Sequence, residues 1–114
     1  MVEIPAGIRR TIEQYIAELG KHKIPVERAV LFGSYAAGTY REYSDINLAI
    51  VSDFFEGFRF EDRRKIRRLT QFVSEDLEML PYRPEDFTPD DPFVKEILET
   101  GIDVTHGFEA VSKN

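Results

Sequence analysis

The sequence predicts an α/β fold of the α+β kind, with a small mixed β-sheet of about four strands flanked by helices. Short apolar runs bounded by Gly, Ser or Pro alternate along the chain with stretches of helical apolar spacing. A hydrophobic content of 42% is typical of a chain with a packed core, and no apolar run approaches the ~20 residues that cross a bilayer. A length of 114 residues predicts one domain over residues 1–114.

In the first half of the chain, apolar residues recur at helical spacing between Pro5 and Gly20. Proline is common where helices start and glycine where they end. Two continuous apolar runs follow, and short runs of this kind form buried strands. The predicted elements are a helix over residues 6–20, strands over 28–32 and 46–51, and a short helix over 35–38.

The second half predicts a loop with an aromatic plug (residues 53–58), then one long helix over about residues 60–75. The apolar stripe of that helix comprises Ile66, Leu69, Phe72 and Val73. Six basic residues crowd the same stretch, as either a solvated face or a contact surface for an acidic partner or nucleic acid. The remaining predicted elements are a strand over 77–80 closed by Pro81, an extended loop over 81–92, a helix from Asp91-Pro92 to Thr100-Gly101, a strand over 102–104, and a loose tail from His106.

Composition and charge narrow the function classes. The formal net charge of −6 disfavours non-specific nucleic-acid binding, which needs clustered Lys and Arg. The absence of cysteine excludes disulfides and thiolate metal sites. The first residues lack the basic and apolar regions of a signal peptide, so we expect a cytoplasmic protein without a membrane partner. His22 and His106 have no ligand-spaced partner and are expected at the surface.

The stretch from Gly33 to Asn47 joins the first two predicted strands. Gly33 and Ser34 offer a hydroxyl and a backbone that a phosphate can approach closely. Asp45 and Asn47 lie two residues apart at the start of a strand, so their side chains share one face. If the two strands are antiparallel neighbours, a phosphate site lies beside a metal-ligand pair. The simpler alternative is a strand-end turn whose short polar groups bond the backbone.

This stretch resembles the signature of the nucleotidyltransferase superfamily with the DNA polymerase beta fold, and in particular its minimal nucleotidyltransferases. Their pattern is Gly-Ser, ten residues, then Asp-x-Asp, and Gly33-Ser34 followed by ten residues and Asp45-Ile46-Asn47 fits all but the last position. Ala37-Gly38 stands where the family usually has Arg-Gly. The resemblance extends over roughly the first hundred residues by the order of elements.

The resemblance implies a Mg²⁺-dependent transferase that moves a nucleoside monophosphate from an NTP, such as ATP, to an acceptor hydroxyl. Gly33 and Ser34 would hold the triphosphate. Asp45 and Asn47 would hold Mg²⁺, with a third acid from the third strand that also serves as a base. Glu78 is the candidate for that acid, and Asp76 would share its face if the strand began early. The competing interpretation of Glu78 is an ordinary solvent-facing acid.

Asn47 is the main departure from the family pattern. An amide oxygen can ligate Mg²⁺ but carries no net charge, and losing a charge near 4 Å at an effective dielectric of ~20 removes a few kcal/mol of attraction. The sequence therefore leaves open whether the chain is an enzyme or a catalytically impaired partner-binding module. A third hypothesis, an unrelated α/β nucleotide-binding domain, predicts that Ser34 and Asp45 lie far apart.

Minimal members of the family often pair with a HEPN-domain protein as a toxin–antitoxin system, in which the nucleotidyltransferase is the antitoxin. The resemblance therefore implies a protein partner that brings the acceptor, and nucleic acid only through such a partner. The basic helix and Phe54, Phe55 and Phe58 are candidate contacts. The oligomeric state, including a homo-oligomer, stays open.

Overall fold

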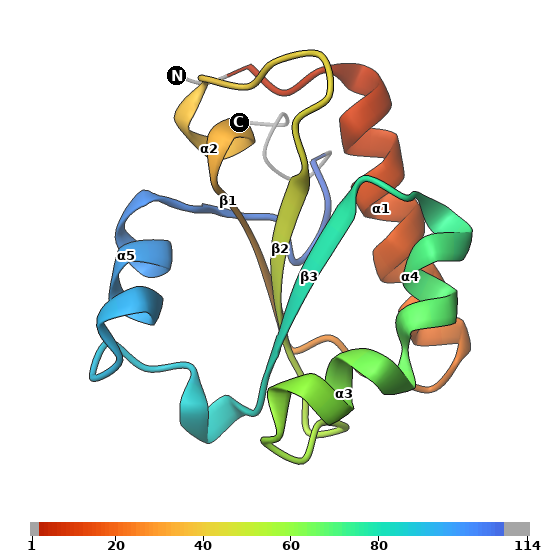
Figure 1. Ribbon diagram of the computed structural model, residues 1–114, viewed down its shortest axis with the longest axis vertical. Helices are drawn as coiled ribbons and strands as arrows, with labels where there is room; N and C mark the ends of the chain where they lie inside the picture. Colours follow the sequence, from red (N-terminus) through yellow and green to blue (C-terminus); the bar gives the residue numbers. More distant parts are fainter. Residues whose placement is uncertain (1–2, 109–114) are drawn as a thin grey trace.

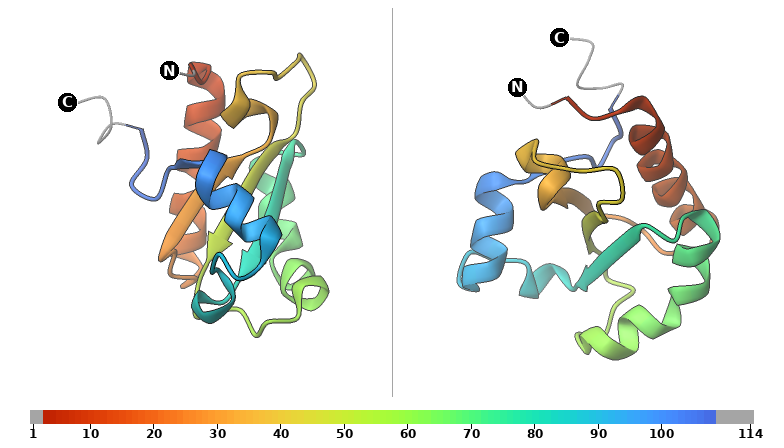
Figure 2. Two further views of the ribbon diagram at one scale, coloured as in Figure 1. Left: turned by 90° about the vertical axis from the view of Figure 1, so that its left-hand side faces the viewer. Right: turned by 45° about the horizontal axis from the view of Figure 1, so that its top comes forward.

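The computed structural model describes residues 3–108 as a four-stranded mixed sheet with helices on both faces (Figures 1 and 2). The predicted fold class is therefore confirmed. In chain order the elements are α1 (Ala6–Lys21), β1 (Arg28–Phe32), α2 (Ser34–Ala37), β2 (Ile46–Val51), α3 (Arg59–Lys65), α4 (Arg67–Val73), β3 (Leu77–Tyr82), a 3₁₀ turn (Pro84–Asp86), α5 (Pro92–Thr100) and β4 (Ile102–Asp103).

The strands lie in the order β3-β2-β1-β4. β1 is antiparallel to both β2 and β4, whereas β2 and β3 are parallel. Both central strands have the predicted bounds, because an apolar run closed by turn residues marks a buried strand at each end. This arrangement meets the condition set by the sequence: the end of β1 and the start of β2 lie at one rim of the sheet.

The two faces of the sheet pack against different helices. On one face, strand residues such as Leu48 and Met79 pack with Ile12 and Tyr15 of α1. On the other face, Ala49, Val51 and Tyr82 pack with Val94 and Ile97 of α5. Figure 1 shows α5 on one side of the sheet and α1 with α4 on the other. Because side chains alternate along a strand, Asn47 and Glu78 belong to the α5 face.

The predicted helix over residues 60–75 is wrong as a single element. The backbone breaks at Ile66, whose φ of −113° and ψ of 12° end α3 and precede α4. The break rotates the second half, so Phe72 is 75% exposed although it was expected in the buried stripe, and Thr70 is buried instead. Ile66 itself remains in the core.

Pro81 does not close the third strand, because β3 continues to Tyr82. The carbonyls of Asp76 and Tyr82 accept the N–H groups of Ile46 and Ser52, at 2.8 and 3.0 Å. Alternate residues of a strand bond to the same neighbour, so Pro81 faces the outer edge of the sheet, where no N–H is required. An edge strand therefore accommodates a proline that the sequence pattern marks as a stop.

The C-terminal segments follow the prediction in part. The Asp91 carboxylate caps α5 by accepting the N–H groups of Phe93 and Val94, at 2.8 and 3.4 Å. The expected loose tail is wrong for its first residues, since the Phe108 N–H donates to the Glu13 carboxylate at 2.9 Å. The rest of that tail, residues 109–114, lies outside the described residues. Across residues 3–108, no helix combines the length and the apolar character that a bilayer span requires.

Candidate functional site

Gly33 and Asn47 are in direct contact where β1 ends and β2 begins. Phe32 is the last residue of β1 and pairs with Asn47, so Gly33 lies one step beyond this pair. Gly33 has φ of +83°, and a Cβ built on it would lie 2.5 Å from Asn47 Nδ2. The glycine is therefore required twice, by its backbone conformation and by the side chain beside it. The two halves of the sequence motif meet through this contact.

Ser34 and Asp45 extend the same rim. Ser34 begins α2 and is partly exposed, and the Ala37 N–H donates to the Gly33 carbonyl at 3.0 Å. The chain then returns through a turn in which the Arg41 N–H donates to Ser44 Oγ at 2.7 Å. Asp45 follows that turn and is exposed immediately before β2. Ser34 follows the last residue pair of β1 and β2 by two positions, and Asp45 precedes that pair by two, so both residues belong to the end of the sheet where β1 ends and β2 begins.

Glu78 lies beside Asn47 on the neighbouring strand. The two residues are register partners in the parallel β2–β3 pair, and their side chains belong to the same sheet face. Glu78 is partly exposed and forms an ion pair with Arg63 of α3, at 3.5 Å. Asp76, the other acid that the sequence offered, precedes β3 in a turn at the same rim. The structure thus brings Gly33, Asn47 and Glu78 to one end of three adjacent strands.

Arg63 is the residue at this rim that sequence reasoning missed. It is one of the six basic residues between positions 59 and 68, and its partner Glu78 lies 15 residues further along the chain. Only the break at Ile66 and the position of β3 bring the two side chains together. The pair is solvent-accessible on both sides, at 45% exposure each, so its net contribution to stability is small. The positive charge of Arg63 also offsets the negative charge that Glu78 brings to the rim.

The donor set at this rim suits a hard cation. Mg²⁺ takes oxygen ligands and is commonly held by one or two carboxylates together with substrate phosphates. Asp45 and Glu78 supply carboxylates and Asn47 supplies an amide oxygen from one sheet face. Within residues 3–108, no three His, Cys, Asp or Glu side chains form a cluster that could hold a metal on their own. These oxygen donors are of the type that Mg²⁺ prefers, and they would need further ligands to complete a coordination shell.

The tyrosines near the motif differ in their role. Tyr35 is buried and stacks on Tyr40, with ring centroids 4.6 Å apart and planes at 19°. Burial, with smaller effects from the nearby Asp76 and Tyr40, raises the pKa of Tyr35 above its ordinary value. This pair fixes the segment after Ser34 against the core. Tyr43 is 86% exposed.

Both histidines, His22 and His106, are exposed, as the sequence predicted.

The chain belongs to the nucleotidyltransferase domain family. The family model for this domain matches residues 9–104, which include every element from α1 to β4 at least in part. The match also spans the Gly-Ser and Asp-x-Asn segments described above. The family resemblance seen in the sequence is thus confirmed.

Three known proteins are similar to this chain. A protein from Methanocaldococcus jannaschii, provisionally named a protein adenylyltransferase, is 40% identical over 45 residues, which is 39% of this chain and 45% of that protein. The alignment therefore spans less than half the length of that relative. A crystal structure of a provisionally named nucleotidyltransferase from Sulfolobus solfataricus has a TM-score of 0.60 at 16% identity, covering 85% of this chain and 78% of the other. A crystal structure of a toxin-antitoxin with AMP-PNP has a TM-score of 0.56 at 18% identity, covering 83% and 70%. At such identities the two structures show the shared fold.

Proposed function

We propose that the chain is a single-domain, Mg²⁺-dependent nucleotidyltransferase that moves a nucleoside monophosphate from ATP or another NTP to an acceptor hydroxyl. The observation that carries this proposal is the contact between Gly33 and Asn47, in register with Glu78 on the next strand. It joins a phosphate-accessible turn to a set of oxygen ligands at one rim. The relative named for protein adenylyltransferase activity supports ATP as the donor.

Two of these residues would bind the nucleotide, and the other three would bind the cation. The Gly33 backbone and the Ser34 hydroxyl would bind the triphosphate, because Gly33 is exposed and Ser34 is partly exposed at the rim. Asp45, Asn47 and Glu78 would hold Mg²⁺ by oxygen atoms. A bound Mg²⁺ would neutralise charge on the phosphate oxygens and help to orient them.

The reaction follows from these roles. The acceptor oxygen forms a bond to the α-phosphorus while the bond between that phosphorus and the bridging oxygen to the β-phosphate breaks. The bridging oxygen keeps the electron pair and leaves with pyrophosphate. We assign Glu78 as the base that takes the hydroxyl proton, because its carboxylate is partly exposed at the rim. The ion pair between Arg63 and Glu78 would have to break before the Glu78 carboxylate could accept this proton.

A second candidate function is a partner-binding module with impaired catalysis. Two observations favour it: Asn47 replaces a charged ligand, and Arg63 opposes the charge of Glu78 at 3.5 Å. Both changes weaken the attraction for a cation. Substituting Asn47→Asp separates the two functions, since an impaired site should gain metal-dependent nucleotide binding when the carboxylate is restored.

A protein partner fits either function. The toxin-antitoxin crystal structure with AMP-PNP shares this fold, which supports an antitoxin role for the chain beside a HEPN-domain partner. In this role the partner would bring the acceptor hydroxyl to the candidate site. A cytoplasmic setting, in which ATP and Mg²⁺ are both plentiful, suits this role.

The proposal is tested by isolating the native protein with its partner and supplying ATP labelled at the α-phosphate. We expect label to enter the partner protein, whereas ATP labelled at the γ-phosphate leaves it unlabelled. Asp45→Ala should abolish labelling, and Ser34→Ala should raise the ATP concentration needed for half-maximal labelling. Equal labelling by wild type and Asp45→Ala would remove the proposed site from the reaction.

A further inference from the structure

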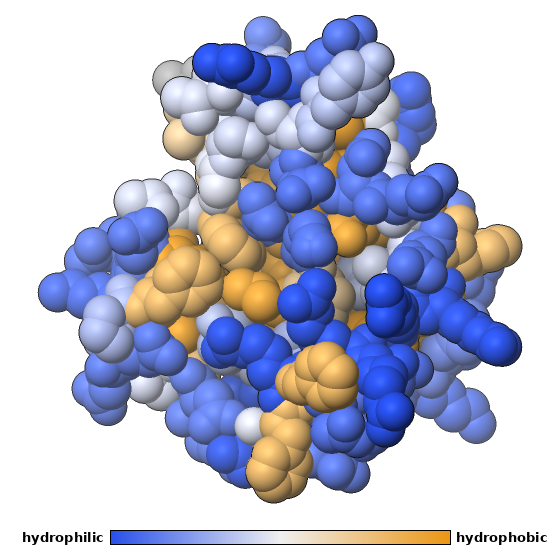
Figure 3. Space-filling view, viewed as in Figure 1, coloured by the Kyte–Doolittle hydropathy of each residue, from blue (hydrophilic) through white to orange (hydrophobic). Residues whose placement is uncertain are grey.

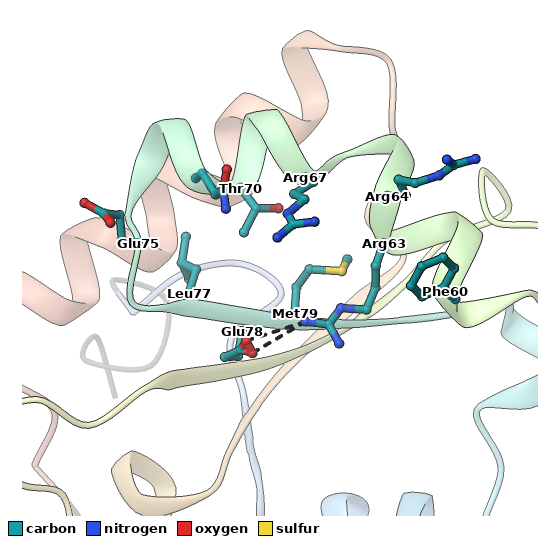
Figure 4. Close-up of a pocket in the computed structure, with 10 residues that line it drawn as sticks. Phe60, Arg63, Arg64, Arg67, Thr70, Glu75, Leu77, Glu78 and Met79 are labelled. Carbon is teal, nitrogen blue, oxygen red and sulfur yellow. Dashed lines mark hydrogen bonds and ion pairs between the residues drawn. The ribbon is translucent and has the colours of Figure 1, made fainter.

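A groove of about 350 Å³ runs between β3 and the α3–α4 pair, next to the candidate site. Figure 4 shows Arg63 and Arg67 directed from the helices toward β3, with Arg64 turned away and Phe60 at one end. Glu78 belongs to both the groove and the candidate site. The lining residues are Phe60, Arg63, Arg64, Arg67, Thr70, Gln71, Glu75, Leu77, Glu78 and Met79.

β3 borders this groove and contributes Leu77, Glu78 and Met79 to its lining. β3 is the terminal strand of the sheet, and its even-numbered residues Asp76 and Tyr82 bond to β2. Met79 alternates with them, so its N–H and C=O point away from β2, toward the groove side. Pro81 on the same edge has no N–H, and the Leu77 N–H donates to the Ser74 carbonyl at 3.4 Å, so an added extended chain would pair with the backbone at Met79.

The groove is lined by more basic than acidic side chains, whereas the molecule as a whole is acidic. The chain carries a net charge of −6, yet Arg67 points into the groove and makes no ion pair with any residue between 3 and 108. Among the same residues, Arg63 forms one ion pair, the exposed pair with Glu78. Figure 3 shows the strongly hydrophilic surface over α3 and α4 beside apolar side chains. Phe58 and Phe60, 68% and 77% exposed, are available for apolar contacts.

We propose that this groove docks an extended acidic polypeptide segment of a partner protein, which adds to the outer edge of β3. Backbone bonds to Met79 would supply affinity, and acidic side chains facing Arg67 and Arg63 would supply specificity. A long polyanion such as RNA is disfavoured, because it extends beyond the groove over a molecule whose net charge is −6.

Docking would also act on the candidate site, a consequence that rests on the proposed transferase function. An acid of the bound segment competes with Glu78 for Arg63, whose pair with Glu78 is long and exposed. Glu78 is thereby released toward the nucleotide when the partner is present. The groove thus couples acceptor binding to the availability of a carboxylate.

The test uses fluorescence anisotropy with a labelled peptide of about ten residues that alternates glutamate and valine, at about 0.15 M salt. We expect saturable binding to the full chain and about tenfold weaker binding to Arg67→Glu, equivalent to about 1.4 kcal/mol. Arg68→Glu is the matched control, because Arg68 is the adjacent exposed arginine of α4 and does not line the groove. It should change affinity less than about twofold.

Two further probes identify the occupant. The same peptide with proline in place of valine keeps its charge but loses backbone donors, and should bind at least about tenfold more weakly. An oligouridylate of equal charge should bind more weakly than the peptide. Absence of peptide binding, equal effects of the Arg67 and Arg68 variants, or preference for the oligouridylate would each overturn the proposal. ATP binding measured on the same variants should be unchanged, so failure of the groove is distinguished from failure of the nucleotide site.

Discussion

Gly33 shows how one residue fixes the geometry of the candidate site. Its φ of 83° and ψ of −152° lie in a region that is essentially restricted to glycine. Asn47 occupies the space where a Cβ would stand, so the backbone turn and the strand start cannot be adjusted independently. Gly33 is also exposed to solvent, so a phosphate could approach its backbone on the side away from Asn47.

Substituting Gly33→Ala should lower the free energy of unfolding by about 2 kcal/mol, from backbone strain and displacement of Asn47. Gly20→Ala is the matched control, because a Cβ at Gly20 in α1 meets nothing within 4 Å. The control should be neutral or stabilising by up to about 1 kcal/mol. Urea denaturation measures both. Equal stability of Gly33→Ala and wild type would show that the contact with Asn47 is not a constraint.

The charge at the rim is the second residue-scale feature. Asp45 and Glu78 contribute two negative charges, and Arg63 offsets part of the second through their 3.5 Å pair. A third carboxylate at position 47 would shift this balance toward cation binding. In the proposed site, Asn47 would therefore set how strongly a metal is held, and the ion pair with Arg63 would set when the Glu78 carboxylate is available to it.

At the scale of elements, Asp62 links α3 to the loop that precedes it. Its side chain is 1% exposed and accepts the N–H groups of Glu56 and Gly57, at 3.1 to 3.2 Å. An acid in the first turn of a helix also interacts favourably with the helix dipole, but this carboxylate in addition satisfies backbone donors of the preceding loop. This anchor positions α3, and with it Arg63, over β3.

Asp62→Ala should cost about 2 to 3 kcal/mol of stability, because two backbone donors lose a charged acceptor. The neighbouring Glu61 is exposed and pairs with Arg64 at 3.0 Å, so Glu61→Ala should change stability by less than about 1 kcal/mol. Thermal unfolding of the two variants compares them directly. A similar loss in both would mark Asp62 as an ordinary surface acid.

The elements also show where sequence reasoning succeeds. The strands over 28–32 and 46–51 were predicted to the residue, because continuous apolar runs and flanking Gly, Ser and Asp are local signals. The break at Ile66 has no local signal, since the surrounding residues all favour helix. It depends on packing Ile66 and Thr70 against α1, which a single sequence does not reveal.

The same distinction holds for the candidate site. The spacing of Gly33, Ser34, Asp45 and Asn47 is a short-range pattern across one strand pair, and the structure brings its two ends together as predicted. The position of Glu78 beside Asn47 depends on the register of a parallel strand pair, whereas the sequence indicated Glu78 only as the acid that the family resemblance implies on the third strand. Its pairing with Arg63 depended on two helices and could not be predicted.

At the scale of the whole molecule, a buried hydrogen bond joins α1 to α4. Tyr15 and Thr70 share a hydrogen bond between their hydroxyls at 2.8 Å, and the Thr70 hydroxyl also reaches the Ile66 carbonyl at 3.1 Å. Burial raises the pKa of Tyr15 to about 12, against a smaller opposing effect of the Thr70 hydrogen bond. The folded chain therefore keeps a proton that the unfolded chain loses near pH 10.

Stability should decline in alkali for this reason. The contribution of Tyr15 is fully present below pH 10 and is lost as pH rises toward 12, by about 1.4 kcal/mol at pH 11. Tyr15→Phe removes this term, so its unfolding free energy should fall less between pH 8 and pH 11 than that of wild type. Tyr35 and Tyr82, whose pKa values burial also raises, remain in both proteins. Parallel declines would contradict the assignment to Tyr15.

The central claim is that Ser34, Asp45 and Asn47 form one site for a nucleotide and its cation, and calorimetric titration of ATP with and without Mg²⁺ tests it most directly. We predict Mg²⁺-dependent binding that Asp45→Ala abolishes and that Asn47→Asp strengthens about tenfold, equivalent to about 1.4 kcal/mol. ATP affinity that is identical with and without Mg²⁺ in all three proteins, or absent even in Asn47→Asp, would contradict the account.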